Sequence, residues 1–168
     1  MLVTRRGRAV TAGRIVETEA YLGPEDAASH AAFRPSSHAL FYGDGGFAYV
    51  YLIYGLHACL NVVAAPVGRP GCVLIRAAEP LEGGSVMARR RGVAPADPRI
   101  ASGPGNLTRA FGITVADNGA DVTRGPLTIE TEPAPPRIRI TRGPRIGITR
   151  AAARPLRFWI AGHPSVSG

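Results

Sequence analysis

Apolar and polar residues alternate along several stretches of this chain, and a period of two residues is typical of β-strands. The clearest stretch is "RIVETEAY" at 14–21, where Ile15, Glu17, Glu19 and Tyr21 fall on one face of the predicted strand. Two interpretations of the carboxylates stay open: they line the wet face of an edge strand, or one is a general base held in a pocket. Their side chains lie about 6 to 7 Å apart on such a strand, so they need not share a proton.

Shorter apolar runs follow, separated by glycine and proline, and they predict further strands and a few short helices. The runs at 47–53 and 57–65 flank Tyr54, Gly55 and Leu56, which predicts a β-hairpin with these residues at its tip. The other predicted strands are 70–80, 126–131, 137–141, 145–149 and 154–160, and short helices are predicted within 22–33, 83–92 and 102–113. The pattern therefore predicts an α+β fold, with a mostly antiparallel sheet and few short helices.

The composition favours a single basic domain. A chain of 168 residues is about one domain by length, its formal net charge is +8, and all 20 basic residues are arginine. This charge favours a polyanionic partner, nucleic acid ahead of a membrane surface, although a GC-rich coding bias also replaces lysine by arginine. The sequence has neither a signal peptide nor a run of about 18 apolar residues, so we expect a cytoplasmic protein that does not enter the membrane.

The sequence contains no recognisable metal or nucleotide motif. Cys59 and Cys72 form no CxxC pair and have no histidine pair at zinc spacing, so we interpret them as small buried residues in a reducing compartment. The "GPGN" turn at 103–106 fits neither the P-loop nor the dinucleotide fingerprint. We expect no metal ion and no other cofactor.

Several polar residues stand where a strand pattern does not require them. Arg76 ends an apolar run, and its guanidinium needs an anion, for which Glu17 and Glu19 are the candidates. His30 either satisfies a local backbone group or contacts a ligand. Asn61 either bridges two strands or lines a site. An ion pair without function remains the alternative for Arg76.

The tyrosines of the predicted hairpin also allow two interpretations. Tyr49 and Tyr51 are placed for core or cross-strand packing, but in a strongly basic chain they also suit the stacking of bases. Tyr54 is a large side chain at a tight turn, with little core to enter. It is therefore the best candidate for a wedge between base pairs.

Five motifs, in this order, resemble the alkyladenine (3-methyladenine) DNA glycosylase family: "RIVETEAYLGPEDAASHA", "YVYLIYGLHACLNVV", "CVLIRAAEPLEG", "SGPGNLTRAFGI" and "RFWIAGHPSVSG". The resemblance extends from about Arg14 to Gly168. It implies one compact domain around a curved antiparallel sheet, with a hairpin that enters the minor groove. It also implies a monofunctional enzyme of base excision repair that hydrolyses the N-glycosidic bond of alkylated or deaminated purines in duplex DNA.

For catalysis, the resemblance implies that Glu19 is the general base that activates water and that Arg76 lies near that water. Glu17 is then a structural neighbour of Glu19. The chain has no lysine, which fits attack by water, because glycosylases that also cut the strand usually need an amine to form a Schiff base.

For recognition, the resemblance implies a pocket in which Tyr21, His30 and Tyr51 stack on and contact the flipped base. Asn61 matches the asparagine that crowds the purine 2-amino position and so disfavours guanine. Tyr54 matches the wedge that fills the gap left in the duplex. Extruding a nucleotide costs a few kcal/mol, and least for a damaged base, so these contacts are large enough to offset it.

We therefore expect residues 1–168 to form one DNA glycosylase domain that acts as a monomer on double-stranded DNA. Its expected substrate is 3-methyladenine, with hypoxanthine as a further candidate. Family members usually carry a helical segment before the first strand, and we expect this chain to lack it, because Met1 lies only some dozen residues before "RIVETEAY". The alternative function is a basic nucleic-acid-binding module that kept the fold and lost catalysis.

Overall fold

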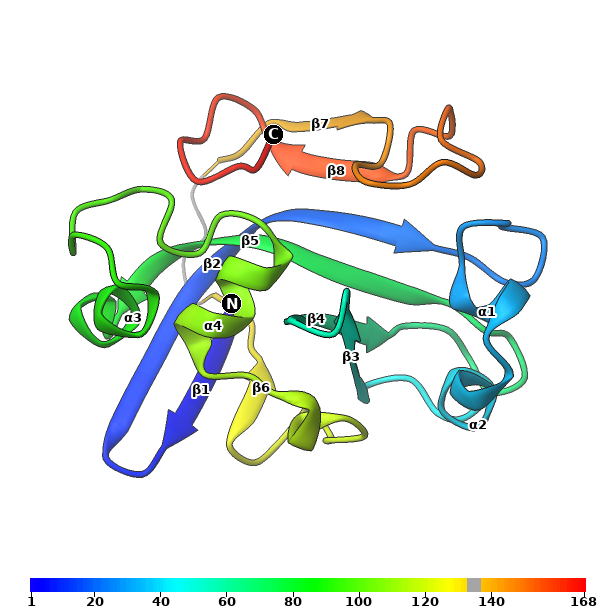
Figure 1. Cartoon of the computed structure of the whole chain (residues 1–168), viewed down its shortest axis with the longest axis horizontal. Coiled ribbons are helices and arrows are strands. Elements are labelled where there is room, and N and C mark those ends of the chain that lie inside the picture. The colour runs from blue at the N-terminus through cyan, green and yellow to red at the C-terminus, as the bar shows by residue number, and fades with distance from the viewer. Residues whose placement is uncertain (133–136) are drawn as a thin grey trace.

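Two long strands, β2 and β5, dominate a structure whose other elements are short (Figure 1). The computed structural model describes residues 1–132 and 137–168. The strands are β1 (Leu2–Arg6), β2 (Ala9–Tyr21), β3 (Ala48–Ile53), β4 (His57–Val63), β5 (Cys72–Glu82), β6 (Leu127–Ile129), β7 (Ile140–Gly143) and β8 (Arg157–Ile160). The helices are α1 (His30–Phe33), α2 (His38–Phe41), α3 (Gly84–Arg91) and α4 (Pro104–Phe111), with 3₁₀ turns η1 (Pro35–Ser37) and η2 (Val115–Asp117).

The described strands form one sheet in the order β3-β4-β5-β2-β1-β6, with β8 pairing both β2 and β7. Every pairing between these strands is antiparallel. β2 is long enough to pair with β1 along its first part and with β8 at Glu17, Thr18 and Glu19. The predicted α+β class with a curved, mainly antiparallel sheet is confirmed.

The position of β2 decides between the two interpretations of its carboxylates. β2 has β5 on one edge and β1 and β8 on the other, and both Glu17 and Glu19 are buried. The interpretation as the wet face of an edge strand is therefore wrong. Both carboxylates must be satisfied by partners inside the protein, because a buried charge without partners is strongly unfavourable.

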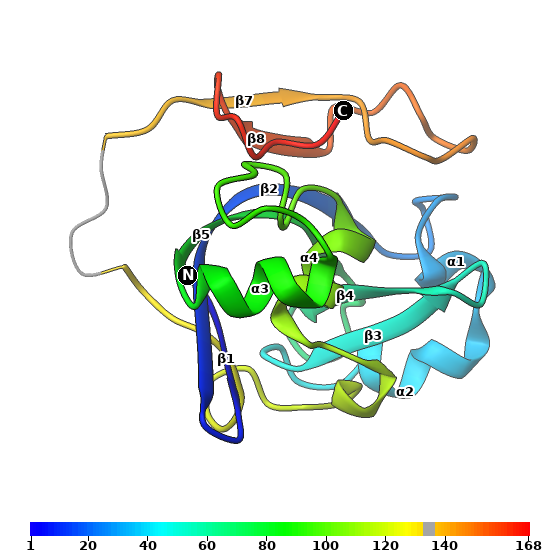
Figure 2. The ribbon, with the colours of Figure 1, turned by 60° about the vertical axis from the view of Figure 1, so that its left-hand side comes forward.

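The main core lies between the sheet and helices α3 and α4. Leu107, Ala110 and Phe111 have the i, i+3, i+4 spacing of one helix face, and they share a buried cluster with Met87 of α3 and Ile75 of β5. Figure 2 shows β2 and β5 arching over these two helices, with β7 and β8 on the opposite side of the arch. The C-terminal strands are thereby placed beside the carboxylates of β2 and not in the main core.

Some sequence predictions about strands are wrong. The pattern did not predict β1, which forms a hairpin with β2. The predicted strand at 145–149 is a loop, because Gly147 has a φ of +77°, which an extended strand does not allow. The predicted strand at 137–141 begins only at Ile140. Within 1–132 and 137–168, no helix is long and apolar enough to cross a membrane.

Candidate active site

A cavity of about 540 Å³ lies between the end of β2, the β3–β4 hairpin, α1 and the β7–β8 loop (residues 144–156). This volume lies in the range of about 300 to 1,000 Å³ that is typical of small-molecule sites. Six residues that the sequence singled out line it: Tyr21, His30, Tyr51, Tyr54, Asn61 and Arg76. The chain thus brings together side chains from four separate segments.

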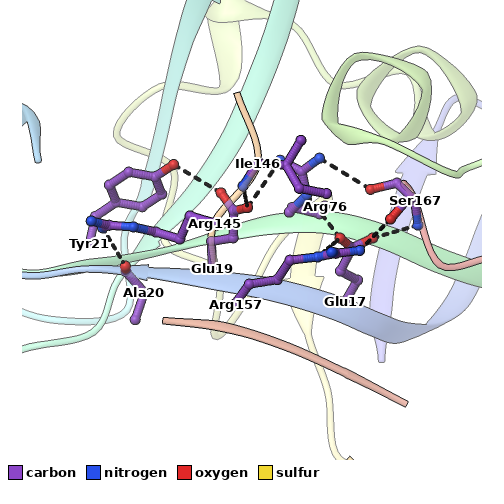
Figure 3. A network of polar contacts seen from close by, with 9 residues as sticks. All are labelled: Glu17, Glu19, Ala20, Tyr21, Arg76, Arg145, Ile146, Arg157 and Ser167. Atoms are coloured by element: carbon purple, nitrogen blue, oxygen red, sulfur yellow. Dashed lines mark hydrogen bonds and ion pairs between the residues drawn. The ribbon is translucent and has the colours of Figure 1, made fainter. Parts of the chain in front are cut away.

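Glu19 does not itself line this cavity, but it is bonded to residues that do (Figure 3). Its side chain is fully buried. The hydroxyl of Tyr21 donates to Oε2 at 2.9 Å, the backbone N–H of Ile146 donates to Oε1 at 2.7 Å, and Nη1 of Arg76 is 3.4 Å from Oε1. All three partners line the cavity, so the carboxylate lies next to it.

Glu17 is also fully buried, but its partners belong to a different part of the molecule. Nε of Arg76 donates to its Oε1 at 3.0 Å, and Nε of Arg157 donates to the same oxygen at 2.7 Å. The backbone N–H of Ser167 donates to Oε2 at 2.7 Å. The C-terminal segment therefore encloses Glu17.

Arg76 bridges the two carboxylates. The sequence left open whether Glu17 or Glu19 is its partner, and the structure shows that it contacts both. The register passes from Glu17 opposite Ala77 to Thr18 opposite Ile75, so Arg76 is the additional residue of a β-bulge. Bulges re-aim side chains, which explains how one residue of a strand reaches two acids on its neighbour.

An aromatic cluster forms the opposite part of the cavity wall. The rings of His30 and Tyr51 have centroids 4.5 Å apart, and those of Tyr49 and Tyr51 are 5.3 Å apart. Nδ1 of His30 is hydrogen-bonded to the hydroxyl of Tyr49 at 2.7 Å, so this histidine bonds a side chain and not a backbone carbonyl. Burial lowers the pKa of His30 to about 4, and the positive charge of Arg34 adds to this effect. His30 is therefore uncharged at neutral pH.

Tyr21 keeps its proton because burial, followed by the negative charge of Glu19, raises the pKa of its hydroxyl well above the ordinary value. It can thus act as a hydrogen-bond donor to Glu19 at neutral pH. The cation of Arg145 lies over its ring, with Cζ 4.6 Å from the centroid.

Asn61 both bridges two strands and lines the cavity, so the two interpretations left open by the sequence are compatible. Its Nδ2 donates to the carbonyl of Tyr49 on β3 at 3.2 Å. Its Oδ1 accepts a weak hydrogen bond from the thiol of Cys72 on β5, with 3.7 Å between the heavy atoms. Burial raises the pKa of Cys72 to about 12, so the sulfur remains a thiol. The orientation of the amide is thereby fixed.

Tyr54 lies at the tip of the hairpin, as predicted, and its side chain is 86% exposed. The N–H of Leu56 donates to the carbonyl of Ile53 at 3.1 Å, which closes a tight turn. Both central residues have positive φ, +53° for Tyr54 and +69° for Gly55. A bulky residue with positive φ is uncommon, and it is found here at an exposed turn beside the cavity.

The sequence missed several residues that complete the site. Ile146 and Arg145 lie in the stretch interpreted as a strand, and Arg157 and Ser167 belong to the C-terminal motif without a role assigned to them. The alternation of "RIGIT" at 145–149 concealed the loop, and no local signal connects these residues to β2. The two cysteines, Cys59 and Cys72, are buried and free, as predicted. In the part of the chain that the structure describes, no group of three or more acidic, histidine or cysteine side chains is placed to hold a metal ion.

Comparison with known proteins covers almost the whole chain. Residues 1–164 match the sequence model of a family described as methylpurine-DNA glycosylase. A relative from Koribacter versatilis is 47% identical over 173 residues, which cover 100% of this chain and 83% of the relative. A relative from Methanoculleus marisnigri is 45% identical over 170 residues, covering 99% of this chain and 88% of the relative. Both bear the name "Putative 3-methyladenine DNA glycosylase".

Proposed function

The chain belongs to the methylpurine-DNA glycosylase family, and on this premise we propose that it hydrolyses the N-glycosidic bond of 3-methyladenine in double-stranded DNA. The observation that carries the proposal is the environment of Glu19. A fully buried carboxylate is hydrogen-bonded to Tyr21 and Ile146, and both of these residues line a cavity of a size suited to a purine nucleotide. Burying a charge is costly, so a buried acid at a cavity is a candidate for chemistry.

The reaction needs a water molecule within reach of this carboxylate. Because Tyr21, Arg76 and Ile146 cover Glu19, the water has to sit where these three groups meet the cavity. Its oxygen attacks C1′ of the deoxyribose, the C1′–N bond breaks, and the bonding electron pair leaves with the purine. Glu19 accepts the proton that the water loses, and the product is an abasic site. We assign to Arg76 the orientation of the water and of the carboxylate.

The leaving purine explains why one base is sufficient for this substrate. A 3-methylated adenine is positively charged in the nucleotide and leaves as a neutral base, so it requires no general acid. Electron-rich rings such as Tyr21 and Tyr51 attract a cation that stacks on them. The uncharged ring of His30 does not repel it. Hypoxanthine is neutral and requires a proton on leaving, so we propose it as a slower, second substrate.

The base reaches the cavity only after it has left the duplex. Extrusion costs a few kcal/mol, and stacking on an aromatic side chain returns roughly 1 to 3 kcal/mol per base. We propose that Tyr21 and Tyr51 stack on the extruded purine and that Tyr54, exposed at the hairpin tip, fills the space it leaves in the duplex. Asn61, whose amide orientation is fixed, crowds the purine 2-amino position and disfavours guanine.

The test is release of the base from DNA. Duplex DNA carrying radiolabelled methyl groups is incubated with the purified protein, and released 3-methyladenine is separated by chromatography. A second duplex with one hypoxanthine is treated with alkali, which cleaves at abasic sites. We expect 3-methyladenine release by the wild-type protein and release slower by roughly 100- to 10,000-fold by Glu19→Gln, in which the amide cannot accept the proton.

The outcomes separate the two functions considered for this fold. Release of 3-methyladenine by the folded wild-type protein supports the enzyme. If the folded protein binds the damaged duplex and releases no base, the proposal is wrong and a nucleic-acid-binding module is the better description. If the protein releases 3-methyladenine but does not release hypoxanthine, only the proposal of the second substrate is wrong.

A further inference from the structure

A fully buried ion pair, Arg145 with Asp26, lies next to the candidate site and has no part in the chemistry proposed above. Nη1 and Nη2 of Arg145 donate to the two carboxylate oxygens of Asp26 at 2.6 and 2.8 Å. Neither side chain has any exposed surface. Asp26 also accepts from the backbone N–H groups of Leu22 and Ala28, at 3.1 and 3.3 Å. The pair therefore joins the loop after β2 to the β7–β8 loop.

The same guanidinium touches the wall of the cavity (Figure 3). Nη1 of Arg145 donates to the carbonyl of Ala20 at 3.0 Å, and the guanidinium lies over the ring of Tyr21. The next residue, Ile146, donates its N–H to Glu19. Arg145 is thus in contact with the tyrosine whose hydroxyl donates to Glu19, and it directly precedes the residue whose N–H donates to Glu19.

We propose that Arg145 is a positioning residue for base release, which rests on the function proposed above. Held by Asp26, it fixes the ring of Tyr21 and the N–H of Ile146 so that both donate to Glu19. The carboxylate is then held in one orientation toward the attacking water. Misplacement of a reacting group by about 1 Å can cost a factor on the order of 100 in rate, so such support has a measurable effect.

The energetics of the pair also favour a geometric role over a purely stabilising one. Well-packed apolar side chains often replace a buried ion pair without loss of stability. Nε of Arg145 is buried and has no hydrogen-bond partner among the described residues, which adds a further cost. Apolar side chains cannot replace the planar guanidinium of Arg145, which binds a carboxylate, a carbonyl and an aromatic ring at the same time.

The experiment compares wild type with Arg145→Lys, which keeps the positive charge and loses the two-pronged contact. Single-turnover release of 3-methyladenine is measured at a temperature where both proteins are folded, together with affinity for the damaged duplex. We expect the rate to fall roughly 10- to 100-fold with little change in affinity. Asp26→Asn should have the same effects. The rate of base release by the double variant should be no lower than that of either single variant, because both substitutions act through one contact.

Arg6→Lys is the matched control. Arg6 also binds a largely buried carboxylate, with Nη2 2.5 Å from Oδ1 of Asp117, but it lies on β1 away from the residues that line the cavity. This variant should lower the melting temperature without changing the single-turnover rate. If Arg145→Lys behaves in the same way as Arg6→Lys, Arg145 is merely structural and the proposal is wrong.

A readout that does not need activity keeps the two proposals apart. In protein labelled with ¹³C at the glutamate carboxyl groups, the signal of Glu19 is identified from its absence in Glu19→Gln, and its chemical shift at neutral pH is compared in wild type, Arg145→Lys and Arg6→Lys. A chemical shift that changes in Arg145→Lys and not in Arg6→Lys supports the positioning role even if the wild-type protein releases no base. An unchanged chemical shift and an unchanged rate in an active enzyme overturn the positioning role alone.

Discussion

Glu17 and Glu19 stand two positions apart on β2, yet they belong to two different regions of the molecule. Glu19 is bonded by Tyr21 and Ile146, which line the cavity. Glu17 is bonded by Arg157 and the backbone of Ser167, in the C-terminal part of the chain. Both carboxylates are fully buried. Burial and charge therefore do not distinguish them.

What distinguishes the two acids is the location of their partners. Arg76 contacts both, so even a shared arginine does not separate the roles. On the cavity side the partners of Glu19 form a wall that a substrate can reach. On the C-terminal side the partners of Glu17 are held to each other, since Ser167 also accepts from Arg76 at 3.1 Å and from Arg157. Glu17 is suited to hold Arg76 in place.

The largest effect is expected from Glu19→Gln on the cavity side. The amide cannot take a proton from water, and general base catalysis contributes roughly 100- to 10,000-fold to a rate. We expect the single-turnover rate of base release to fall by that factor while affinity for the damaged duplex is retained. A fall in affinity of similar size would show instead that Glu19 has a binding role.

A smaller effect is expected from Tyr54→Ala, which alters the cavity side without touching Glu19. Loss of a stacked aromatic group costs roughly 1 to 3 kcal/mol, so affinity for a lesion in an intact duplex should fall by about 5- to 150-fold. A lesion in a bulge is already extruded, and binding to it should change less. Equal losses on both substrates would contradict the wedge.

Glu17→Gln alters the carboxylate whose partners lie on the C-terminal side, and it is expected to affect stability more than the rate of base release. The substitution weakens contacts to Arg76 and Arg157 and to the N–H of Ser167, which is expected to cost about 1 to 3 kcal/mol in the free energy of unfolding. For a protein of this size that corresponds to roughly 2 to 4 °C in melting temperature per kcal/mol. The rate of base release by the folded variant should change far less than in Glu19→Gln. Equal rate losses in the two folded variants would mean that the division of roles is wrong.

The titration of His30 is expected to change the stability of the protein with pH. Its pKa is about 4 in the folded protein, against about 6.5 in an unfolded chain, so the unfolded state takes up the proton first as the pH falls. The contribution of the neutral ring to stability is complete above pH 6.5 and is lost between pH 6.5 and 4. Melting temperatures of wild type and His30→Asn should therefore converge as the pH falls through this window. A constant difference would contradict the assignment.

Local patterns predicted those elements whose structure depends on neighbouring residues. The alternation around Glu19 indicated a strand, and "YGL" between two apolar runs indicated the hairpin with Tyr54 at its tip. The same rule failed at 145–149, where alternation is present but Gly147 adopts a positive φ. Periodicity reports which residues can share a face of a strand, and it does not report whether the strand forms.

The sequence by itself determined that Glu17, Glu19 and Tyr21 stand close together on one strand, because side-chain direction in a strand is a local property. Only the tertiary structure decided which acid faces the cavity. The N–H of Ile146 that bonds Glu19 is 127 residues away in the chain, and that of Ser167, which bonds Glu17, is 150 residues away. Contacts over such separations depend on how the C-terminal strands pack against β2, which no local pattern encodes.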